Sequence, residues 1–117
     1  MSVLVQATAR GDVLLRRGIT EEWGIRWEHS TDGGRTFEPV SWAGWSGELQ
    51  LTSITGEVWA ARPVSLEAGA LCRVVIPHDL LAGAEWAARS QGAWSVTLTH
   101  DDGRRERLAD GYFYLEA

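Results

Sequence analysis

The 117-residue sequence has no lysine, a single cysteine and no uninterrupted run of 18 apolar residues. The missing apolar run argues against a transmembrane helix, which needs about 20 predominantly apolar residues. Residues 1–12 also lack the basic segment followed by an apolar stretch that is typical of a signal peptide, so we expect no targeting segment. Because Cys72 has no cysteine partner, an internal disulfide is excluded and the fold must be held by its core.

Positive charge is scarce and scattered. Eleven arginines face sixteen carboxylates, the formal net charge is -5, and no basic run is longer than a pair such as Arg104-Arg105. Nucleic-acid-binding domains usually carry a concentrated basic patch. We therefore expect neither a nucleic-acid partner nor a membrane partner.

The length and composition are those of one ordinary folded domain. The hydrophobic fraction is 44% and the charged fraction 23%, which excludes a disordered or fibrous chain. We expect a single β-sandwich domain over residues 1–117, with residues 1–10 as an extended N-terminal arm.

Alternation of apolar and polar residues dominates the chain and predicts strands, because successive side chains of a strand point to opposite faces. Strands are expected at 12–17, 22–28, 47–54, 58–61, 71–77, 94–98, 104–108 and 112–116, and residues 37–40 start the return of the hairpin that begins with 22–28. Turns are expected at 29–36, 55–56 and 101–103, where Gly, Asp, Ser and Thr gather. The inward-facing core residues of these strands are predicted to be Trp23, Ile25, Trp27, Leu49, Leu51, Val74, Ile76, Trp94, Val96 and Leu98.

One segment departs from the alternation. In residues 78–90, Leu80, Leu81, Ala84 and Ala88 recur near helical spacing, and Asp79 is placed to act as an N-cap. The prediction is an all-β protein, an antiparallel sandwich of seven or eight strands with one short helical segment near 78–90.

The residues that could carry chemistry are isolated. His29, His78 and His100 show no metal-ligand spacing, and the segment from His100 to Gly103 reads as a strand end followed by a turn. Neither a nucleophile-elbow motif nor a phosphate-binding loop is present. Cys72 lies in an apolar strand, where burial raises a thiol pKa. We expect no enzyme activity, no cofactor and no metal site.

Tryptophan is the unusual residue, with seven copies in a small chain. Trp23, Trp27 and Trp94 fall on apolar strand faces and are assigned to the core. For the remaining four, packing within the chain, contact with another protein and carbohydrate binding stay open. As interface candidates these are Trp42, Trp45, Trp59 and Trp86, with an irregular corner over 40–47 presenting Trp42 and Trp45 outward.

Three segments resemble one known family. They are Gly11-Asp12 before the first strand, residues 39–51 (PVSWAGWSGELQL), and Gly92-Ala93-Trp94-Ser95-Val96 followed by Asp102-Gly103-Arg104 and Leu108-Ala109-Asp110-Gly111. Together they resemble the small immunoglobulin-like β-sandwich domains of tailed-phage virions. Such domains occur in tail collar proteins to which side fibres attach and at the N-terminus of baseplate upper proteins. The corner departs from the family pattern, with Ser41 where Asp is common, Trp42 where Leu is common and Ala43 where Ser or Thr is common.

The resemblance implies an immunoglobulin-like sandwich and a non-enzymatic structural role in a bacteriophage virion. The implied protein is a multicopy docking or accessory subunit of the tail, in the collar, tail tip or baseplate, made in the host cytoplasm and incorporated into the particle. Its partners would be other phage virion proteins arranged in a ring or lattice. A capsid decoration or minor capsid protein is an alternative. A carbohydrate-binding module, with Trp42, Trp45 and Trp59 as a glycan platform, is the alternative of another class.

Overall fold

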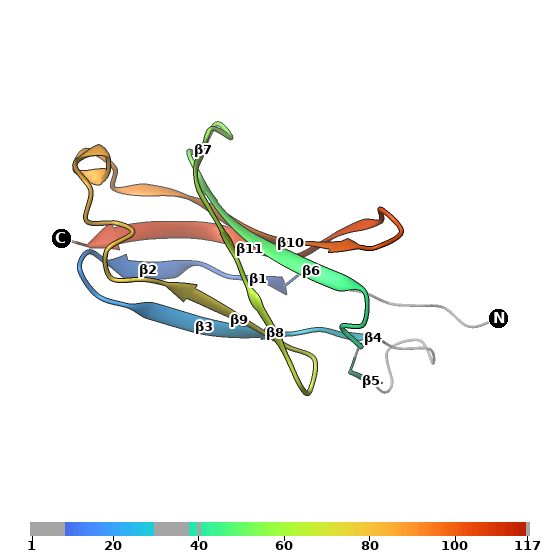
Figure 1. Cartoon of the computed structure of the whole chain (residues 1–117). Coiled ribbons are helices and arrows are strands. Elements are labelled where there is room, and N and C mark those ends of the chain that lie inside the picture. Colours follow the sequence, from blue (N-terminus) through green and yellow to red (C-terminus); the bar gives the residue numbers. More distant parts are fainter. Residues whose placement is uncertain (1–8, 30–37, 40, 117) are drawn as a thin grey trace.

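Two β-sheets face each other in this chain (Figure 1). The computed structural model describes residues 9–29, 38–39 and 41–116. One sheet has six strands, in the order β1-β11-β10-β6-β7 with β2 also paired to β11, and the other has the order β3-β9-β8. The strands of the six-stranded sheet are β1 (Ala9–Arg10), β2 (Val13–Arg16), β6 (Trp45–Thr52), β7 (Val58–Pro63), β10 (Gln91–His100) and β11 (Arg105–Glu116). Those of the three-stranded sheet are β3 (Glu21–Arg26), β8 (Ser65–Glu67) and β9 (Leu71–Ile76).

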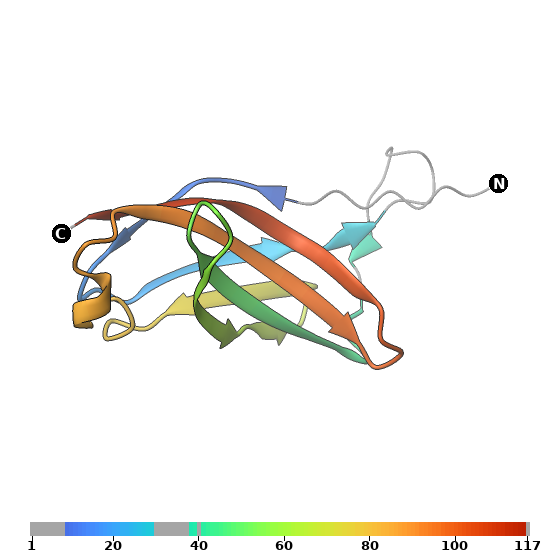
Figure 2. The same cartoon turned by 90° about the horizontal axis from the view of Figure 1, so that it is seen from above.

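The strand order is that of an immunoglobulin-like sandwich. In that fold the third, sixth and seventh strands form one sheet, and the second, fifth and fourth form the other. Here β6, β10 and β11 take the first set of positions and β3, β9 and β8 the second. The predicted fold class is therefore confirmed. Among the described strands, β1 and β2 alone depart from antiparallel pairing, because both run parallel to β11 along one edge (Figure 2).

The core lies between the two sheets. Nine of the ten residues predicted to face inward are buried, and Trp23 is half-buried against them. The alternation explains this placement: Leu49 and Leu51 on β6, and Val96 and Leu98 on β10, are at most 1% exposed. The same cluster takes in seven side chains that were not among the ten predicted core residues, namely Leu15, Cys72, Leu81, Trp86, Leu108, Ala109 and Phe113.

The C-terminal strand is longer than expected. The segments 104–108 and 112–116 form one continuous strand, β11, and not two. Its pairing with β10 shifts at Val96/Thr97, a bulge that leaves Leu108 unpaired and lets both Leu108 and Ala109 point inward. Gly111 does not end the strand. A Cβ there would lie 1.8 Å from the carbonyl oxygen of Gly11, so glycine permits the close approach of the N-terminal segment.

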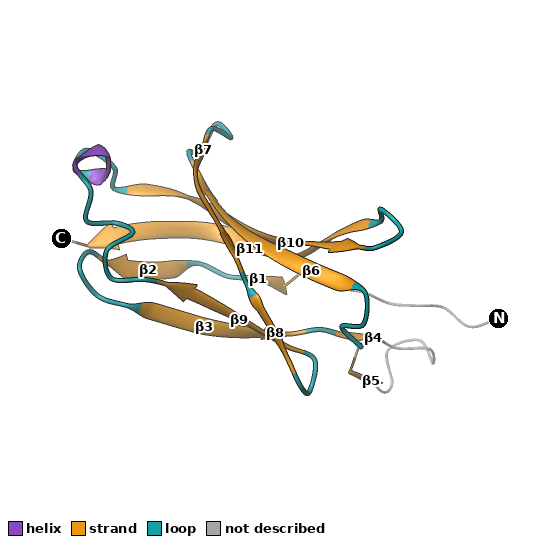
Figure 3. Cartoon of the chain, in the orientation of Figure 1, coloured by secondary structure: helices purple, strands orange, loops and turns teal. Residues whose placement is uncertain are grey.

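The helical segment is smaller than predicted. Within 78–90 only a short 3-10 helix, η1 (Ala84–Trp86), is present (Figure 3). The N-cap is Gly83, without a side-chain bond, so the assignment of Asp79 as N-cap was wrong. The neighbouring backbone closes tight turns, with Leu80 N–H bonded to Pro77 C=O at 3.0 Å, and no i-to-i+4 ladder develops. Among the described residues, no helix is long and apolar enough to cross a membrane.

Two of the predicted turns are present. Gly56 N–H bonds to Ser53 C=O and Gly103 N–H bonds to His100 C=O, with positive φ at both glycines. The two-residue strands β4 (Glu28–His29) and β5 (Glu38–Pro39) pair antiparallel, as the ends of a hairpin would. The rest of the predicted 29–36 turn, residues 37 and 40, and positions 1–8 of the expected N-terminal arm lie outside the described residues; Ala9 and Arg10 form β1.

Candidate functional site

The corner before β6 packs inward. Trp42 stacks on Trp27 with ring centroids 5.4 Å apart and planes at 21°, and Trp45 meets the same ring edge-on at 5.2 Å. The corner is a tight turn, closed by the bond from Trp45 N–H to Trp42 C=O and by Gly44 at φ +80. Trp42 Nε1–H also donates to Glu67 C=O at 2.9 Å. The turn is as irregular as expected, but it directs both indoles onto the core.

Trp59 and Trp86 belong to a second aromatic cluster near η1. Their centroids are 5.7 Å apart, and the guanidinium of Arg89 lies 4.4 Å from the Trp59 ring and 4.6 Å from the Trp86 ring. Arg17 donates to the backbone carbonyls of Trp86 and Arg89, which ties β2 to this segment. Trp86 is only 2% exposed. The cluster therefore closes one end of the sandwich.

These two clusters correct the expectation of outward-facing tryptophans. Trp86 has almost no surface to offer a partner, and Trp42, Trp45 and Trp59 are partly buried against the core. Trp59 also lies in a different cluster from the other two, so the three do not form one glycan platform. The physical reason is that edge-to-face and stacked indole pairs bury large apolar area inside the chain.

The titratable side chains of Cys72 and Asp102 contribute to the core and to a turn, respectively. Burial raises the pKa of the Cys72 thiol to about 11, as expected for a cysteine on an inward strand face. Beside the 101–103 turn, hydrogen bonds from the backbone and side chain of Arg104 lower the pKa of the Asp102 carboxyl. Among the residues that the structure describes, no group of three or more His, Cys, Asp or Glu side chains could hold a metal ion.

Sequence reasoning missed the exposed apolar groups of one sheet edge. Leu14 on β2 is 59% exposed and lies directly opposite Tyr114 on β11, which is 42% exposed. Tyr112, two positions earlier on β11, is 46% exposed and points to the same face. We call these three side chains the edge patch. The alternation of Tyr112 and Tyr114 with buried Phe113 is the sequence signal that could have revealed it.

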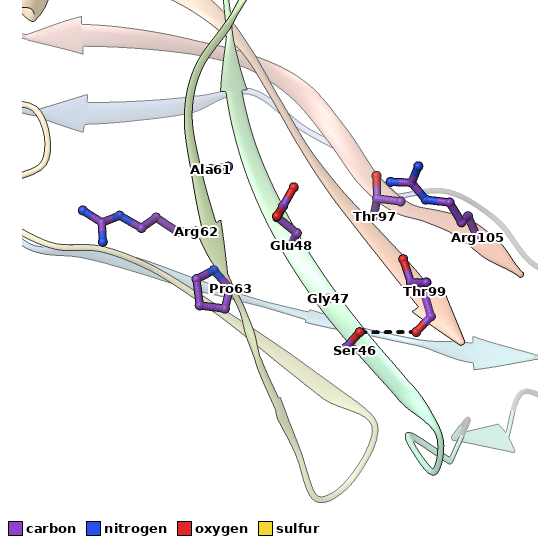
Figure 4. A pocket seen from close by; sticks show the side chains of 9 residues that line it. All are labelled: Ser46, Gly47, Glu48, Ala61, Arg62, Pro63, Thr97, Thr99 and Arg105. Carbon is purple, nitrogen blue, oxygen red and sulfur yellow. Dashed lines mark hydrogen bonds between the residues drawn. The ribbon is translucent and has the colours of Figure 1, made fainter. Parts of the chain in front are cut away.

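The outer face of the six-stranded sheet, away from the core, is hollowed. A hollow of about 260 Å³ lies over β7, β6 and β10, between Pro63 and Arg105 (Figure 4). A second of about 410 Å³ adjoins it at Thr97 and Arg105. A third of about 390 Å³ continues from Gln50 and Arg107 to Tyr112 in the edge patch. We call these adjoining hollows the sheet trough.

Comparisons with known proteins give only distant similarities. Neither a protein-family model nor a curated protein matches the sequence. Among solved structures, fibronectin(III)-like modules of Clostridium thermocellum CbhA are similar at 10% identity and a TM-score of 0.40, over 97% of this chain and 96% of that one. A structure of Dpr1 IG1 bound to DIP-eta IG1 is similar at 6% identity and a TM-score of 0.44, over 99% of this chain and 98% of that one. These similarities assign no ligand or partner to the chain.

Proposed function

We propose that the protein is a non-enzymatic structural module that docks onto other subunits of a tailed-phage virion, in several copies, as part of the tail. The edge patch of Leu14, Tyr112 and Tyr114 is the observation that carries the docking role. Large apolar side chains gathered on one exposed surface are characteristic of protein contacts, and tyrosine is among the residues enriched there. The phage setting follows from the resemblance of the 39–51 corner and the C-terminal strands.

The position of the patch suits docking. It lies where edge strand β2 meets β11, so a partner can cover the apolar side chains without disturbing the packing between the sheets. The seven tryptophans, by contrast, lie in the core or pack against it. The patch therefore takes the role that the sequence assigned to Trp42 and Trp45.

Complementation of a phage that lacks this gene tests the proposal. The wild-type chain should be found in purified particles by mass spectrometry, and labelling with specific antibody should place it on the tail. A Leu14→Ser/Tyr114→Ser variant should remain folded, since both side chains are exposed, yet be incorporated at least tenfold less. Val75→Ser, an exposed apolar residue on the three-stranded sheet, is the matched control and should be incorporated normally.

The outcomes are separable. Absence of the wild-type chain from particles would refute the virion role altogether. Incorporation of the Leu14/Tyr114 variant at the wild-type level would show that the edge patch is not the docking surface. Antibody label on the capsid would refute the tail assignment and indicate a capsid decoration protein.

A further inference from the structure

The sheet trough is built from polar cross-strand pairs. On β6 and β10, Gln50 lies opposite Ser95, Glu48 opposite Thr97 and Ser46 opposite Thr99. Because Leu49, Leu51, Val96 and Leu98 point to the core, their neighbours necessarily form the floor of the trough. The floor thus offers hydroxyl and amide groups, which can both donate and accept hydrogen bonds, together with the Glu48 carboxylate, which accepts them.

Much of this hydrogen-bonding capacity is not used for the fold. Ser46 Oγ makes only a long bond of 3.5 Å to Thr99 C=O (Figure 4), and Gln50 Nε2 donates to Glu48 at 3.1 Å. Among the described residues, the hydroxyls of Ser95 and Thr97 have no hydrogen-bond partner within the chain. Short side chains also let a ligand approach the sheet closely. A flat ligand rich in hydroxyl groups fits such a floor.

The trough is lined by four arginines, Arg10, Arg62, Arg105 and Arg107, and by three carboxylates, Glu48, Glu106 and Asp110, so it carries a small excess of positive charge in an acidic chain. Arg105 lines two of the hollows, and among the described residues no carboxylate lies within ion-pair distance of it. Arg62, on the rim at β7, likewise has no ion-pair partner there. Arg10 and Arg107 both lie within ion-pair distance of Asp110, at 3.2 and 3.5 Å. A carboxylate on a ligand would give Arg105 the ion-pair partner that the described residues do not provide.

An exposed aromatic ring, that of Tyr112, lies at the end of the sheet trough nearest the edge patch. Tyr112 lines the third hollow, and its ring is exposed. The nonpolar face of a sugar ring packs on such a ring, while its hydroxyls reach the polar groups beside it. The floor hydroxyls, the Arg105 guanidinium and the exposed Tyr112 ring therefore follow one another along the outer face of the six-stranded sheet.

From this arrangement we infer that the sheet trough binds an acidic polysaccharide, a chain of sugar units that carry carboxylates. The ligand lies across β6, β10 and β11, with a carboxylate on Arg105 and hydroxyls on Thr97 and Gln50. The three adjoining hollows provide room for several consecutive sugar units. This activity goes beyond the proposed docking role and does not depend on it.

Binding of defined oligosaccharides tests the inference directly. In calorimetry at low ionic strength, oligogalacturonate should bind the wild-type chain, while cello-oligosaccharide of the same length, which has no carboxylates, should bind at least tenfold more weakly. Arg105→Gln should weaken oligogalacturonate binding at least fivefold, because it removes an exposed charge without touching the core. Arg26→Gln, an exposed arginine on the three-stranded sheet, is the matched control and should bind as wild type.

Any of four results would overturn the inference, three of them from binding of the wild-type chain and one from the Arg105→Gln variant. The first three are no binding of oligogalacturonate at millimolar concentration, equal binding of the neutral oligosaccharide, and equal binding of single-stranded DNA, which would indicate a general polyanion site. Unchanged affinity of the Arg105→Gln variant for oligogalacturonate would show that the ligand does not bind in the sheet trough. The Leu14→Ser/Tyr114→Ser variant should keep its oligogalacturonate affinity, so failure of docking and failure of glycan binding are told apart.

Discussion

Removal of the Trp94 indole should be the most costly single change in this sandwich. Trp94 on β10 is 4% exposed and meets Trp23 on β3 edge-to-face, with centroids 5.4 Å apart, so the pair joins the two sheets. Its Nε1–H also donates to Gly11 C=O at 2.9 Å and anchors the N-terminal segment. Trp94→Ala should therefore lower the free energy of unfolding by about 3 to 5 kcal/mol, the usual cost of a buried large aromatic.

A second substitution separates the contributions to that loss. Trp94→Phe keeps an aromatic ring against Trp23 but removes the Nε1–H donor, so it should cost much less, on the order of 1 to 2 kcal/mol. A double-mutant cycle with Trp23→Ala should give a coupling energy of about 0.5 to 1.5 kcal/mol for the ring pair.

Urea unfolding followed by tryptophan fluorescence and circular dichroism measures all of these changes, with an unchanged m-value as the sign that only stability has moved. A loss below about 1 kcal/mol for Trp94→Ala would refute the register of β10 and the inward placement of its indole.

Three further changes have clear expected outcomes. Trp42→Ser/Trp45→Ser should lower the melting temperature strongly, because both indoles pack on Trp27. A melting temperature equal to that of the wild type would show that the two side chains lie on the surface. Gly111→Ala should destabilise the chain in urea unfolding, since a Cβ would clash with the backbone of the N-terminal segment, and a neutral result would show that this segment moves freely. With a pKa raised to about 11, the Cys72 thiol stays protonated at pH 8, so it should react with a thiol reagent only in denaturant. Rapid reaction of the folded chain would contradict the burial of this side chain.

The sequence by itself determined the fold class and most of the core. Period-two alternation assigned Leu49, Leu51, Val96 and Leu98 to an inward face, and a strand has only two faces, so one buried residue specifies its neighbours. The single cysteine could likewise be placed in an apolar strand with a raised thiol pKa. These features depend on local pattern, which a sequence contains in full.

Long-range contacts decided the remainder. The sequence predicts a break between 108 and 112, but Gly111 lies within β11, where the backbone of Gly11, a hundred positions away, approaches it closely. Asp79 had the residue type of an N-cap, yet the tight turns after Pro77 left no regular helix for it to cap.

The tryptophans show the same division most clearly. The sequence contained a surplus of indoles and a corner able to present two of them outward, but it could not show that Trp27 lay beneath that corner. Pairing of the rings inside the chain moved the exposed apolar surface to Leu14, Tyr112 and Tyr114, which come together only because β2 runs parallel to β11. Which side chains remain on the surface is thus set by how the sheets pair and pack, a property of the whole chain that no local pattern carries.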